Sequence, residues 1–408
     1  MKTLLSINNY YYLRGGAEFV FLEQNRLFEQ AGWQVVPFAM QHENNLDSEY
    51  GDYFVDEIEL GRDYHPLQRV RKALKAMYSF EARSKIRRLI DHVRPNIAHA
   101  HNLYHHLSPS ILPVLRQSGI PTVLTLHDLK IACPAYRMMT HDGICERCKN
   151  GAFYQAYTNR CLHGSRLLSG WGAAEAYLHR LLKSYAANVT RFIVPSRFYR
   201  DKFVAWGWPE DRFDYVPNFV AAEALVPCYE PAAPFTYFGR LSSEKGLETL
   251  IRAAASVNAS LQIIGTGPDT ETLKALAKRL GVNADFPGFV SGESLFDRIR
   301  ASRAVVLPSE WYENAPISVL EAYACGKPVI GADIGGIPEL IDNERGRTFE
   351  SCSSESLAAT LQKFLDWPDA RIAEMGEAAR QYVLDAHSES TYLRNLSAVY
   401  KPLMDEGR

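Results

Sequence analysis

Short apolar runs recur along the chain, and most of them end at a glycine, a proline or a polar turn. The run over 4–8 precedes a turn that contains Gly15 and Gly16. A helical pattern follows over 18–32, and another apolar run covers 34–38. This order of strand, glycine turn, helix and strand predicts a doubly wound α/β sheet. The glycine turn is not the G-x-G-x-x-G fingerprint, which disfavours an NAD enzyme.

The same alternation begins again in the second half of the chain. A stretch rich in proline and alanine at 220–234 predicts the interdomain linker. Beyond it, apolar runs alternate with glycine turns and helical patterns, so a second parallel α/β domain is expected. Three of its expected strands cover 235–238, 261–264 and 304–307. The domains are predicted at 1–215 and 216–385.

Length, composition and charge fit this organisation. The chain has 408 residues, of which 47% are hydrophobic and 23% are charged, so two ordinary globular domains are expected. The formal net charge of −2 argues against a generally basic nucleic-acid binder. No apolar run approaches the roughly 20 residues of a membrane span. We expect a cytoplasmic protein whose contact with a membrane is limited to its surface.

One segment departs from the average charge. Residues 62–94 contain ten Lys or Arg and three Asp or Glu, with apolar residues between them at helical spacing. Basic amphipathic helices of this kind can lie on anionic lipid. An exposed helix that packs its apolar stripe on its own domain has the same pattern. Both interpretations stay open from the sequence.

Four cysteines fall within an insertion at about 130–165. Their spacing is C-x11-C-x2-C-x12-C, and the residues between them are polar and glycine-rich. Four thiolates at such spacing suit a tetrahedral structural zinc, which would order a segment with little apolar content. Unlinked thiols and a redox pair are the alternatives. The expected ligands are Cys133, Cys145, Cys148 and Cys161.

Histidines follow two of the expected strands in the first half. His127 stands at the carboxyl end of the apolar run 121–126, where a histidine can act as a general acid or base or donate a hydrogen bond to substrate. His101, His105 and His106 follow another strand, in a segment that we interpret as an irregular loop. We expect these three to be ordinary polar loop residues and not metal ligands.

The second half carries two cations and two carboxylates at the ends of its expected elements. Arg240 and Lys245 follow a strand and precede a helix, where cations and free amides suit a diphosphate. Glu313 precedes a helix expected to begin near Pro316, and Glu321 lies inside that helix. Ligands of open α/β sheets bind at the carboxyl ends of the strands, so both carboxylates can face one crevice.

These motifs resemble family 4 of the nucleotide-sugar glycosyltransferases. The resemblance rests on Glu313-x7-Glu321 and on Gly-Arg-Leu-x2-Glu-Lys-Gly at 239–246. Gly-Lys-Pro-Val-Ile at 326–330 and Gly-Gly-Ile-Pro-Glu at 335–339 fit in order and spacing, and the match covers nearly the whole chain. The resemblance implies the GT-B architecture, in which two Rossmann-like domains face each other across a cleft. It also implies retaining transfer of a sugar from a nucleotide diphosphate donor.

The resemblance assigns roles to individual positions. Arg240 and Lys245 look like the cations that bind the donor diphosphate, and Glu313 resembles the glutamate that grips the hydroxyls of the donor sugar. Glu321 resembles the glutamate that accepts the ribose hydroxyls, and His127 the histidine that touches the transferred sugar. The other implied donor-binding positions are Gly15, Gly16, Phe289, Val290, Asn314, Ala315, Pro316 and Ile317.

Further expectations concern partners, metals and the chain terminus. The architecture implies that a helix over 386–408 crosses back to the first domain. No Asp-x-Asp triplet occurs in the chain, so catalysis without a metal is expected. The implied acceptor is a saccharide or a lipid-linked saccharide in surface polysaccharide synthesis, at the inner face of the membrane. The alternatives are a nucleotide-sugar hydrolase or epimerase, a sucrose- or glycogen-type synthase, and a zinc-stabilised binding module.

Overall fold

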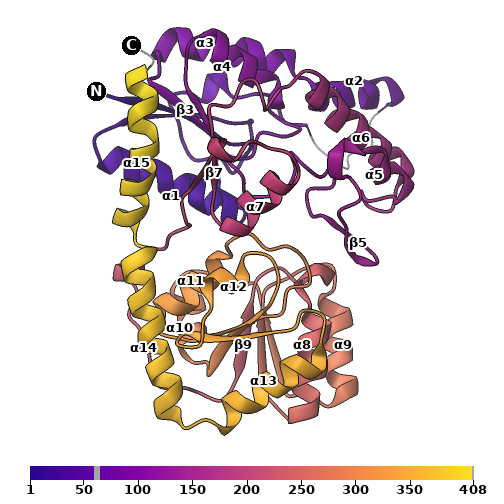
Figure 1. Ribbon diagram of the computed structural model, residues 1–408, viewed down its shortest axis with the longest axis vertical. Coiled ribbons are helices and arrows are strands. Elements are labelled where there is room, and N and C mark those ends of the chain that lie inside the picture. The colour runs from indigo at the N-terminus through magenta and orange to yellow at the C-terminus, as the bar shows by residue number, and fades with distance from the viewer. Residues whose placement is uncertain (59–64, 407–408) are drawn as a thin grey trace.

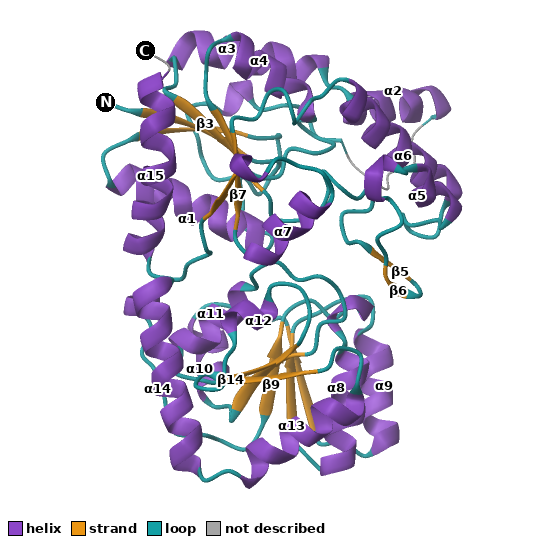
Figure 2. Ribbon diagram, in the orientation of Figure 1, coloured by secondary structure: helices purple, strands orange, loops and turns teal. Residues whose placement is uncertain are grey.

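Two six-stranded sheets, each in its own domain, form the framework of the molecule (Figures 1 and 2). The structure, a computed structural model, describes residues 1–58 and 65–406. The first sheet has the order β2-β1-β3-β4-β7-β8 and the second the order β11-β10-β9-β12-β13-β14. All the strand pairs within these two sheets are parallel.

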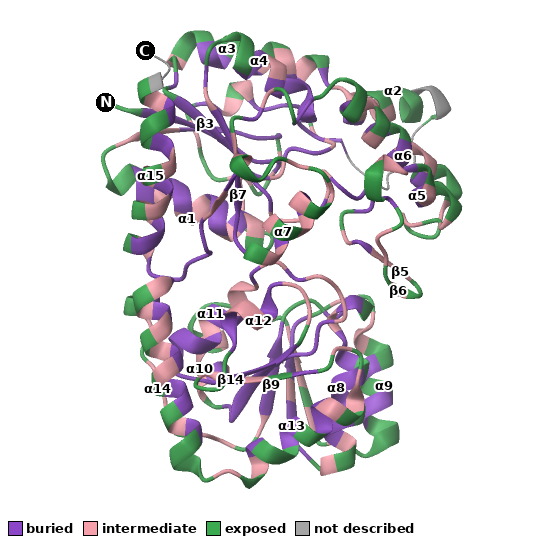
Figure 3. Ribbon diagram, in the orientation of Figure 1, coloured by how far each residue is buried: buried purple, intermediate pink, exposed green. Residues whose placement is uncertain are grey.

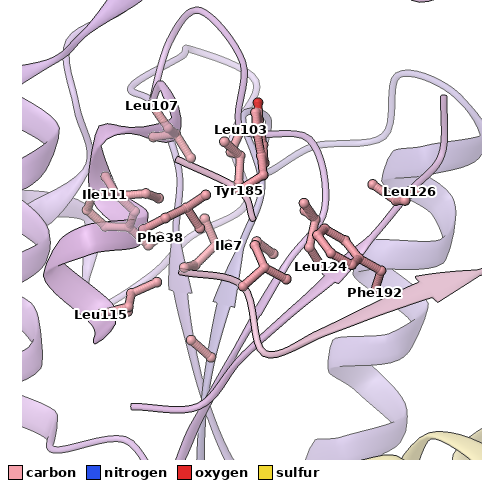
Figure 4. Close-up of a cluster of buried hydrophobic side chains, with 14 of the residues drawn as sticks. Ile7, Phe38, Leu103, Leu107, Ile111, Leu115, Leu124, Leu126, Tyr185 and Phe192 are labelled. Atoms are coloured by element: carbon pink, nitrogen blue, oxygen red, sulfur yellow. The ribbon is translucent and has the colours of Figure 1, made fainter. Parts of the chain in front are cut away.

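The first sheet consists of β1 (Thr3–Ile7), β2 (Gln34–Phe38), β3 (Ile97–Ala100), β4 (Thr122–Thr125), β7 (Arg191–Val194) and β8 (Phe213–Tyr215). Its strands are mostly buried, as expected for a parallel sheet covered on both faces. Figure 4 shows one side of this core, where side chains from the strands and from neighbouring segments meet. The helices of this domain are α1 (Gly16–Gln30), α2 (Pro66–Met77), α3 (Phe80–Val93), α4 (Leu112–Gln117), α5 (Tyr154–Thr158), α6 (Arg166–Leu181) and α7 (Arg197–Ala205).

The second sheet consists of β9 (Phe235–Phe238), β10 (Leu261–Ile264), β11 (Ala284–Gly288), β12 (Ala304–Leu307), β13 (Val329–Ala332) and β14 (Gly346–Phe349). Its strand order is that of the dinucleotide-binding doubly wound fold. The order reverses between β9 and β12, so this position is the topological switch point where ligands of such sheets bind. The helices of this domain are α8 (Leu247–Val257), α9 (Thr270–Leu280), α10 (Glu293–Arg300), α11 (Ile317–Ala324), α12 (Ile337–Leu340) and α13 (Ser354–Asp366).

Two final helices connect the domains along one side of the molecule (Figure 1). α14 (Asp369–Ala386) packs on α11 of the second domain, whereas α15 (Glu389–Glu406) lies against α1 and β3 of the first. Leu396 and Tyr400 of α15 are fully buried in one cluster with Phe28 of α1 and Ile97 of β3. The chain end is therefore part of the core of the first domain.

The basic segment predicted at 62–94 forms two helices, α2 and α3, and its residues 62–64 lie outside the described part. α3 buries Ile86, Leu89 and Ile90 in the core of the first domain. α2 leaves Val70 and Leu74 exposed, as Figure 3 shows for much of this helix. The two helices of the segment therefore differ. α3 packs its apolar stripe on the domain, and α2 carries exposed apolar side chains.

The cysteine-rich insertion contains the small antiparallel pair β5 (Met139–Thr140) and β6 (Gly143–Ile144), followed by α5. α5 packs on α6, with Phe153, Ala156 and Ala173 in a small separate cluster. Among the described helices, none is both long enough and apolar enough to cross a membrane.

Truncating Leu396 tests the packing of α15 on the first domain. Leu396→Ala removes a fully buried side chain and leaves a cavity, so we expect the free energy of unfolding to fall by about 2–5 kcal/mol. Lys401→Ala on the exposed face of the same helix is the control, with a change within about 0.5 kcal/mol. Urea denaturation measures both. Equal stabilities of the two variants would contradict the packing.

Candidate active site

An ion pair lies at the switch point of the second sheet. Lys245 stands in the turn between β9 and α8, and Glu313 follows β12, so the two residues approach from neighbouring strands. Nζ of Lys245 donates to Oε1 of Glu313 at 2.7 Å, and Oγ of Ser309 donates to the same oxygen at 2.8 Å. Only 8% of Glu313 is exposed. The cation and the carboxylate of the two separate motifs therefore form one site.

The surroundings of Glu313 keep it ionised. Burial alone would raise the pKa of this carboxyl, but the charge of Lys245 and its hydrogen bond, together with the hydroxyl of Ser309, outweigh burial and lower the pKa. At neutral pH the side chain is a carboxylate that accepts hydrogen bonds. Such a group can bind hydroxyls of a sugar.

The loop between Glu313 and α11 is covered by two glycines. α11 begins at Ile317, with Pro316 as its extended N-cap, one residue later than the sequence predicts. Gly335 has a φ of +62°, and a Cβ there would lie 2.4 Å from the carbonyl oxygen of Glu313. A Cβ on Gly336 would lie 1.9 Å from the carbonyl oxygen of Asn314. Any side chain at these two positions would displace the carboxylate loop.

Asn314 links this loop to the first domain. Its Nδ2 donates to the carbonyl oxygen of Leu126, at the end of β4, at 2.9 Å. Its Oδ1 accepts from Oγ of Ser196 at 2.7 Å. A Cβ placed on Gly16 would stand 3.4 Å from Cδ1 of Ile317. The glycine turn, the end of β4 and the start of α11 thus meet at the domain interface.

Two further glutamates join the domains, and the sequence did not indicate either role. Glu339 accepts from the backbone N–H groups of Arg197 at 2.9 Å and Phe198 at 2.6 Å, so it caps α7 from the opposite domain. Glu146, in the cysteine-rich insertion, accepts from the hydroxyl of Tyr312 at 2.9 Å. A single charged residue gives no sequence signal for such a long-range contact.

His127 lies next to the domain interface and contacts another histidine. Its Nε2 is 2.8 Å from Nδ1 of His101. His101 is fully buried, and His106 is 4% exposed with Tyr10 and Ile58 as partners. Both residues lie in a loop, as expected, but they are buried and not ordinary exposed loop residues. The loop folds back over the ends of β1 and β3, which a local pattern does not reveal.

The other predicted site residues differ in their exposure to solvent. Arg240 is exposed, and its backbone oxygen accepts from the hydroxyl of Tyr237 at 2.8 Å. Phe289 is 75% exposed, whereas Val290 packs partly against the core. Burial raises the pKa of Glu321 to about 7. Gly15 precedes α1, the carbonyl oxygen of Ala315 accepts from Nδ2 of Asn218 at 2.8 Å, and Pro316 is the N-cap of α11.

The four cysteines of the insertion carry free thiols. The pKa of Cys148 is raised to about 12 and that of Cys161 to about 11. Burial is the larger cause at both positions, and the charge of the neighbouring Cys133 is the second. Cys145 also contributes at both positions, so the four thiols share one neighbourhood. Within residues 1–58 and 65–406, no three or more His, Cys, Asp or Glu side chains are arranged to hold a metal ion. The zinc site stays a prediction.

The two facing parallel-sheet domains are those of a two-domain glycosyltransferase, and comparisons with known proteins agree. The model of Glycosyltransferase Family 4 matches residues 14–224, and that of Glycosyl transferases group 1 matches 229–382. The chain belongs to glycosyltransferase family 4 and has the GT-B fold. The resemblance inferred from the four motifs is thereby confirmed.

Several curated glycosyltransferases are similar to part of the chain. A GDP-mannose-dependent monoacylated alpha-(1-6)-phosphatidylinositol monomannoside mannosyltransferase from Corynebacterium glutamicum is 34% identical over 155 residues, 35% of this chain and 40% of the relative. A GDP-mannose-dependent alpha-(1-6)-phosphatidylinositol monomannoside mannosyltransferase from Mycobacterium tuberculosis is 29% identical over 252 residues, 54% of this chain and 63% of the relative. The chain thus spans about half the length of the curated relatives it matches.

Solved structures share the whole architecture. Sucrose-phosphate synthase from Thermosynechococcus elongatus superposes with a TM-score of 0.75 at 19% identity, over all of both chains. HepE from Anabaena, solved in complex with UDP and glucose, gives a TM-score of 0.69 at 15% identity, over 98% of this chain and 100% of that one. At such identities the likeness establishes the fold alone.

The raised pKa of Glu321 predicts a pH-dependent stability. An unfolded glutamate ionises near pH 4.5, whereas burial holds folded Glu321 protonated up to about pH 7. The protein therefore loses stability as pH rises from about 4.5 to 7, because only the unfolded chain ionises freely. Glu321→Gln lacks this loss, so we expect it to melt higher than the wild type at pH 8 and equally near pH 4.5. Thermal melting at both pH values measures the difference in melting temperature between the variant and the wild type. A difference that does not change with pH would contradict the raised pKa of Glu321.

Proposed function

We propose that this protein is a retaining glycosyltransferase that moves a sugar from a nucleoside diphosphate donor to a saccharide or lipid-linked acceptor. The observation that carries the proposal is the Lys245–Glu313 pair at the switch point of the second sheet. It provides a cation for a diphosphate and a carboxylate for sugar hydroxyls within one hydrogen bond of each other. The start of α11 lies beside them and supplies free backbone amides.

The leaving group explains why cations belong at this position. When the glycosidic bond breaks, negative charge develops on the phosphate oxygens of the departing nucleoside diphosphate. Lys245, Arg240 and the N-terminus of α11 stabilise this charge more in the transition state than in the ground state. The sequence has no Asp-x-Asp triplet for a divalent ion on the diphosphate. Charge neutralisation by side chains and amides is thus the basis of the proposed metal-independent catalysis.

In the proposed mechanism, retention comes from attack on the face of the sugar that the leaving group occupies. The acceptor hydroxyl attacks the anomeric carbon from the face that the phosphate leaves, and the leaving phosphate oxygen takes the acceptor proton. Glu313 holds the sugar hydroxyls, and His127, at the end of β4, contacts the transferred sugar from the first domain. Glu321 accepts from the ribose, and Phe289 with Val290 lies near the base. Binding between two domains excludes water and favours transfer over hydrolysis.

Replacing Glu313 tests the proposal. We expect Glu313→Gln to lower kcat by about 100-fold or more, because the neutral amide loses both its charge pairing with Lys245 and part of its hold on the sugar. Glu344→Gln, on an exposed loop of the same domain, is the control and keeps full activity. Transfer from a panel of UDP- and GDP-sugars measures both variants. Release of free sugar without an acceptor product would instead indicate the hydrolase, and normal transfer by Glu313→Gln would exclude the assignment.

A lipid-linked acceptor requires the enzyme to reach a membrane, and one exposed face of the first domain has suitable chemistry. Leu167 and Leu181 of α6 are 83% and 81% exposed. Arg166, Arg180 and Lys183 are exposed on and just after the same helix. Exposed leucines interspersed with cations match an interfacial helix on anionic lipid.

α2 lies beside α6. The indole N–H of Trp171 on α6 donates to the carbonyl oxygen of Ala73 on α2 at 3.2 Å, so the helices lie together (Figure 3). Val70 and Leu74 of α2 are 59% and 61% exposed. We define the membrane face by these four apolar residues of α2 and α6, and propose that it rests on the inner leaflet.

Sedimentation with vesicles tests the membrane face. We expect the wild type to bind vesicles that contain phosphatidylglycerol more strongly than pure phosphatidylcholine, and less strongly at high salt. The double variant Leu167→Glu/Leu181→Glu should lose this binding, since it buries two carboxylates in the headgroup region. Val226→Glu, a similarly exposed position outside this face, is the control. Equal binding by all three proteins would refute the face.

We also propose that the insertion binds one structural zinc through Cys133, Cys145, Cys148 and Cys161. The support is the spacing of the four thiols and their shared neighbourhood in a segment with little core of its own. Binding would draw the thiols together as thiolates and release their protons.

Metal analysis after purification without chelator tests the zinc proposal. About one equivalent of zinc is expected per chain, and Cys145→Ser/Cys148→Ser should lose it. Cys352→Ser, exposed in the other domain, is the control and should keep it. Less than about half an equivalent in the wild type would refute the site.

A further inference from the structure

A column of three histidines lies beneath the domain interface. His99 of β3 and His101 just after it stack at 4.6 Å between ring centroids, with 20° between their planes. His101 and His127 follow at 5.1 Å and 18°. His99 and His101 are fully buried, and only His127, at the end of the column, is partly exposed. The sequence places His127 apart from the other two, and the parallel pairing of β3 and β4 brings them together.

Hydrogen bonds fix His99 at one end of the column and join His101 to His127. The hydroxyl of Tyr400, on α15, contacts Nδ1 of His99. Nε2 of His99 is 2.7 Å from Oγ1 of Thr125. Nδ1 of His101 is 2.8 Å from Nε2 of His127. Each ring orientation is therefore set by a partner from another element.

The protonation of the last pair follows from its surroundings. Burial, which is the main cause, lowers the pKa of His127 to about 4 and that of His101 well below its usual value, so both rings are neutral at pH 7. A neutral imidazole has one N–H, and one proton lies between Nδ1 of His101 and Nε2 of His127. Nε2 of His101 is buried without a hydrogen-bond partner. A buried N–H without an acceptor is rarer in proteins than an acceptor without a donor, so the proton of His101 belongs on Nδ1.

This assignment fixes the tautomer of His127. If His101 donates from Nδ1, Nε2 of His127 accepts, and the single proton of His127 is on its Nδ1. The described part of the chain gives that Nδ1 no hydrogen-bond partner, and the backbone of His127 lies within 3.5 Å of Nδ2 of Asn314, next to Glu313. The residue that carries this donor therefore contacts the neighbour of Glu313 in the sequence.

We propose that His101 is a positioning residue: it holds His127 as the Nδ1–H tautomer, so that His127 donates a hydrogen bond to a hydroxyl oxygen of the transferred sugar. The inference deepens the proposed function and rests on it. Glu313 accepts from the sugar hydroxyls, and His127 complements it by donating. Without His101 the ring of His127 turns freely and exchanges between its two neutral tautomers. Only a fraction of the enzyme molecules then has the Nδ1–H donor of His127 in place.

Histidine tautomers are read directly by long-range nitrogen–proton NMR of protein labelled with ¹⁵N-histidine. The His127 signals are identified as those that His127→Gln removes. We expect the wild type to show His127 protonated on Nδ1, and His101→Leu to show a mixture of both tautomers. Finding the wild-type His127 protonated on Nε2 would overturn the proposal. This measurement does not depend on turnover. If the protein has no transferase activity, the proposed function is refuted, and the spectrum still determines the tautomer of His127.

Kinetics separate positioning from simple structural support. We expect His101→Leu to lower kcat by about 10- to 100-fold, with a smaller change in the KM for the donor. His101→Asn places an amide N–H near the position of Nδ1 and should restore most of the rate. His101→Asp can only accept when ionised, so it should force the other tautomer and remain slow. If the three variants lose activity in proportion to their melting temperatures, His101 is only structural. If His101→Leu does not fold, His101→Asn and the wild-type spectrum still decide the proposal.

Discussion

The arrangement of the site depends on one ion pair, between the buried Glu313 and the partly buried Lys245. The strand order of the second sheet reverses between β9 and β12, and each partner of the pair lies in the segment that follows one of these strands. Removing one partner of a buried pair typically costs about 3–5 kcal/mol, because the other charge is left without compensation. The pair therefore joins the two strand ends, and the same two charges are available for a ligand that has phosphates and hydroxyls.

The second domain does not hold this loop alone. Asn314 bonds to the end of β4, Glu339 caps α7, and Tyr312 donates to Glu146 of the cysteine-rich insertion. All three contacts flank Glu313 in space or in sequence, and all three reach the first domain. A shift between the domains would therefore move the carboxylate loop, so the position of the domains affects the proposed donor site. The insertion takes part through Glu146, which lies between Cys145 and Cys148.

Much of this was predictable because local patterns specify local structure. Apolar runs bounded by glycine or proline gave the strands, as with 261–264 and 304–307, which the structure has as β10 and β12. The motifs that contain Lys245 and Glu313 indicated one donor site, and the structure brings these two side chains together. Nothing local, by contrast, marked His101 as buried, because its environment comes from β4 and α1. Glu339 and Glu146 were missed for the same reason: their partners lie in the other domain, more than 140 residues away in the case of Glu339 and Arg197.

The most direct test is calorimetric titration of the wild type and of Lys245→Met with UDP and with GDP, in buffer that contains EDTA. Lys274→Met, an exposed lysine of α9, is the matched control. The account predicts that the wild type and the control bind one of the two nucleotides without a divalent cation. It also predicts that Lys245→Met binds that nucleotide at least about tenfold more weakly, since one charge-assisted contact is lost. Binding that requires magnesium, or equal affinities of Lys245→Met and the wild type, would contradict the central role of this cation.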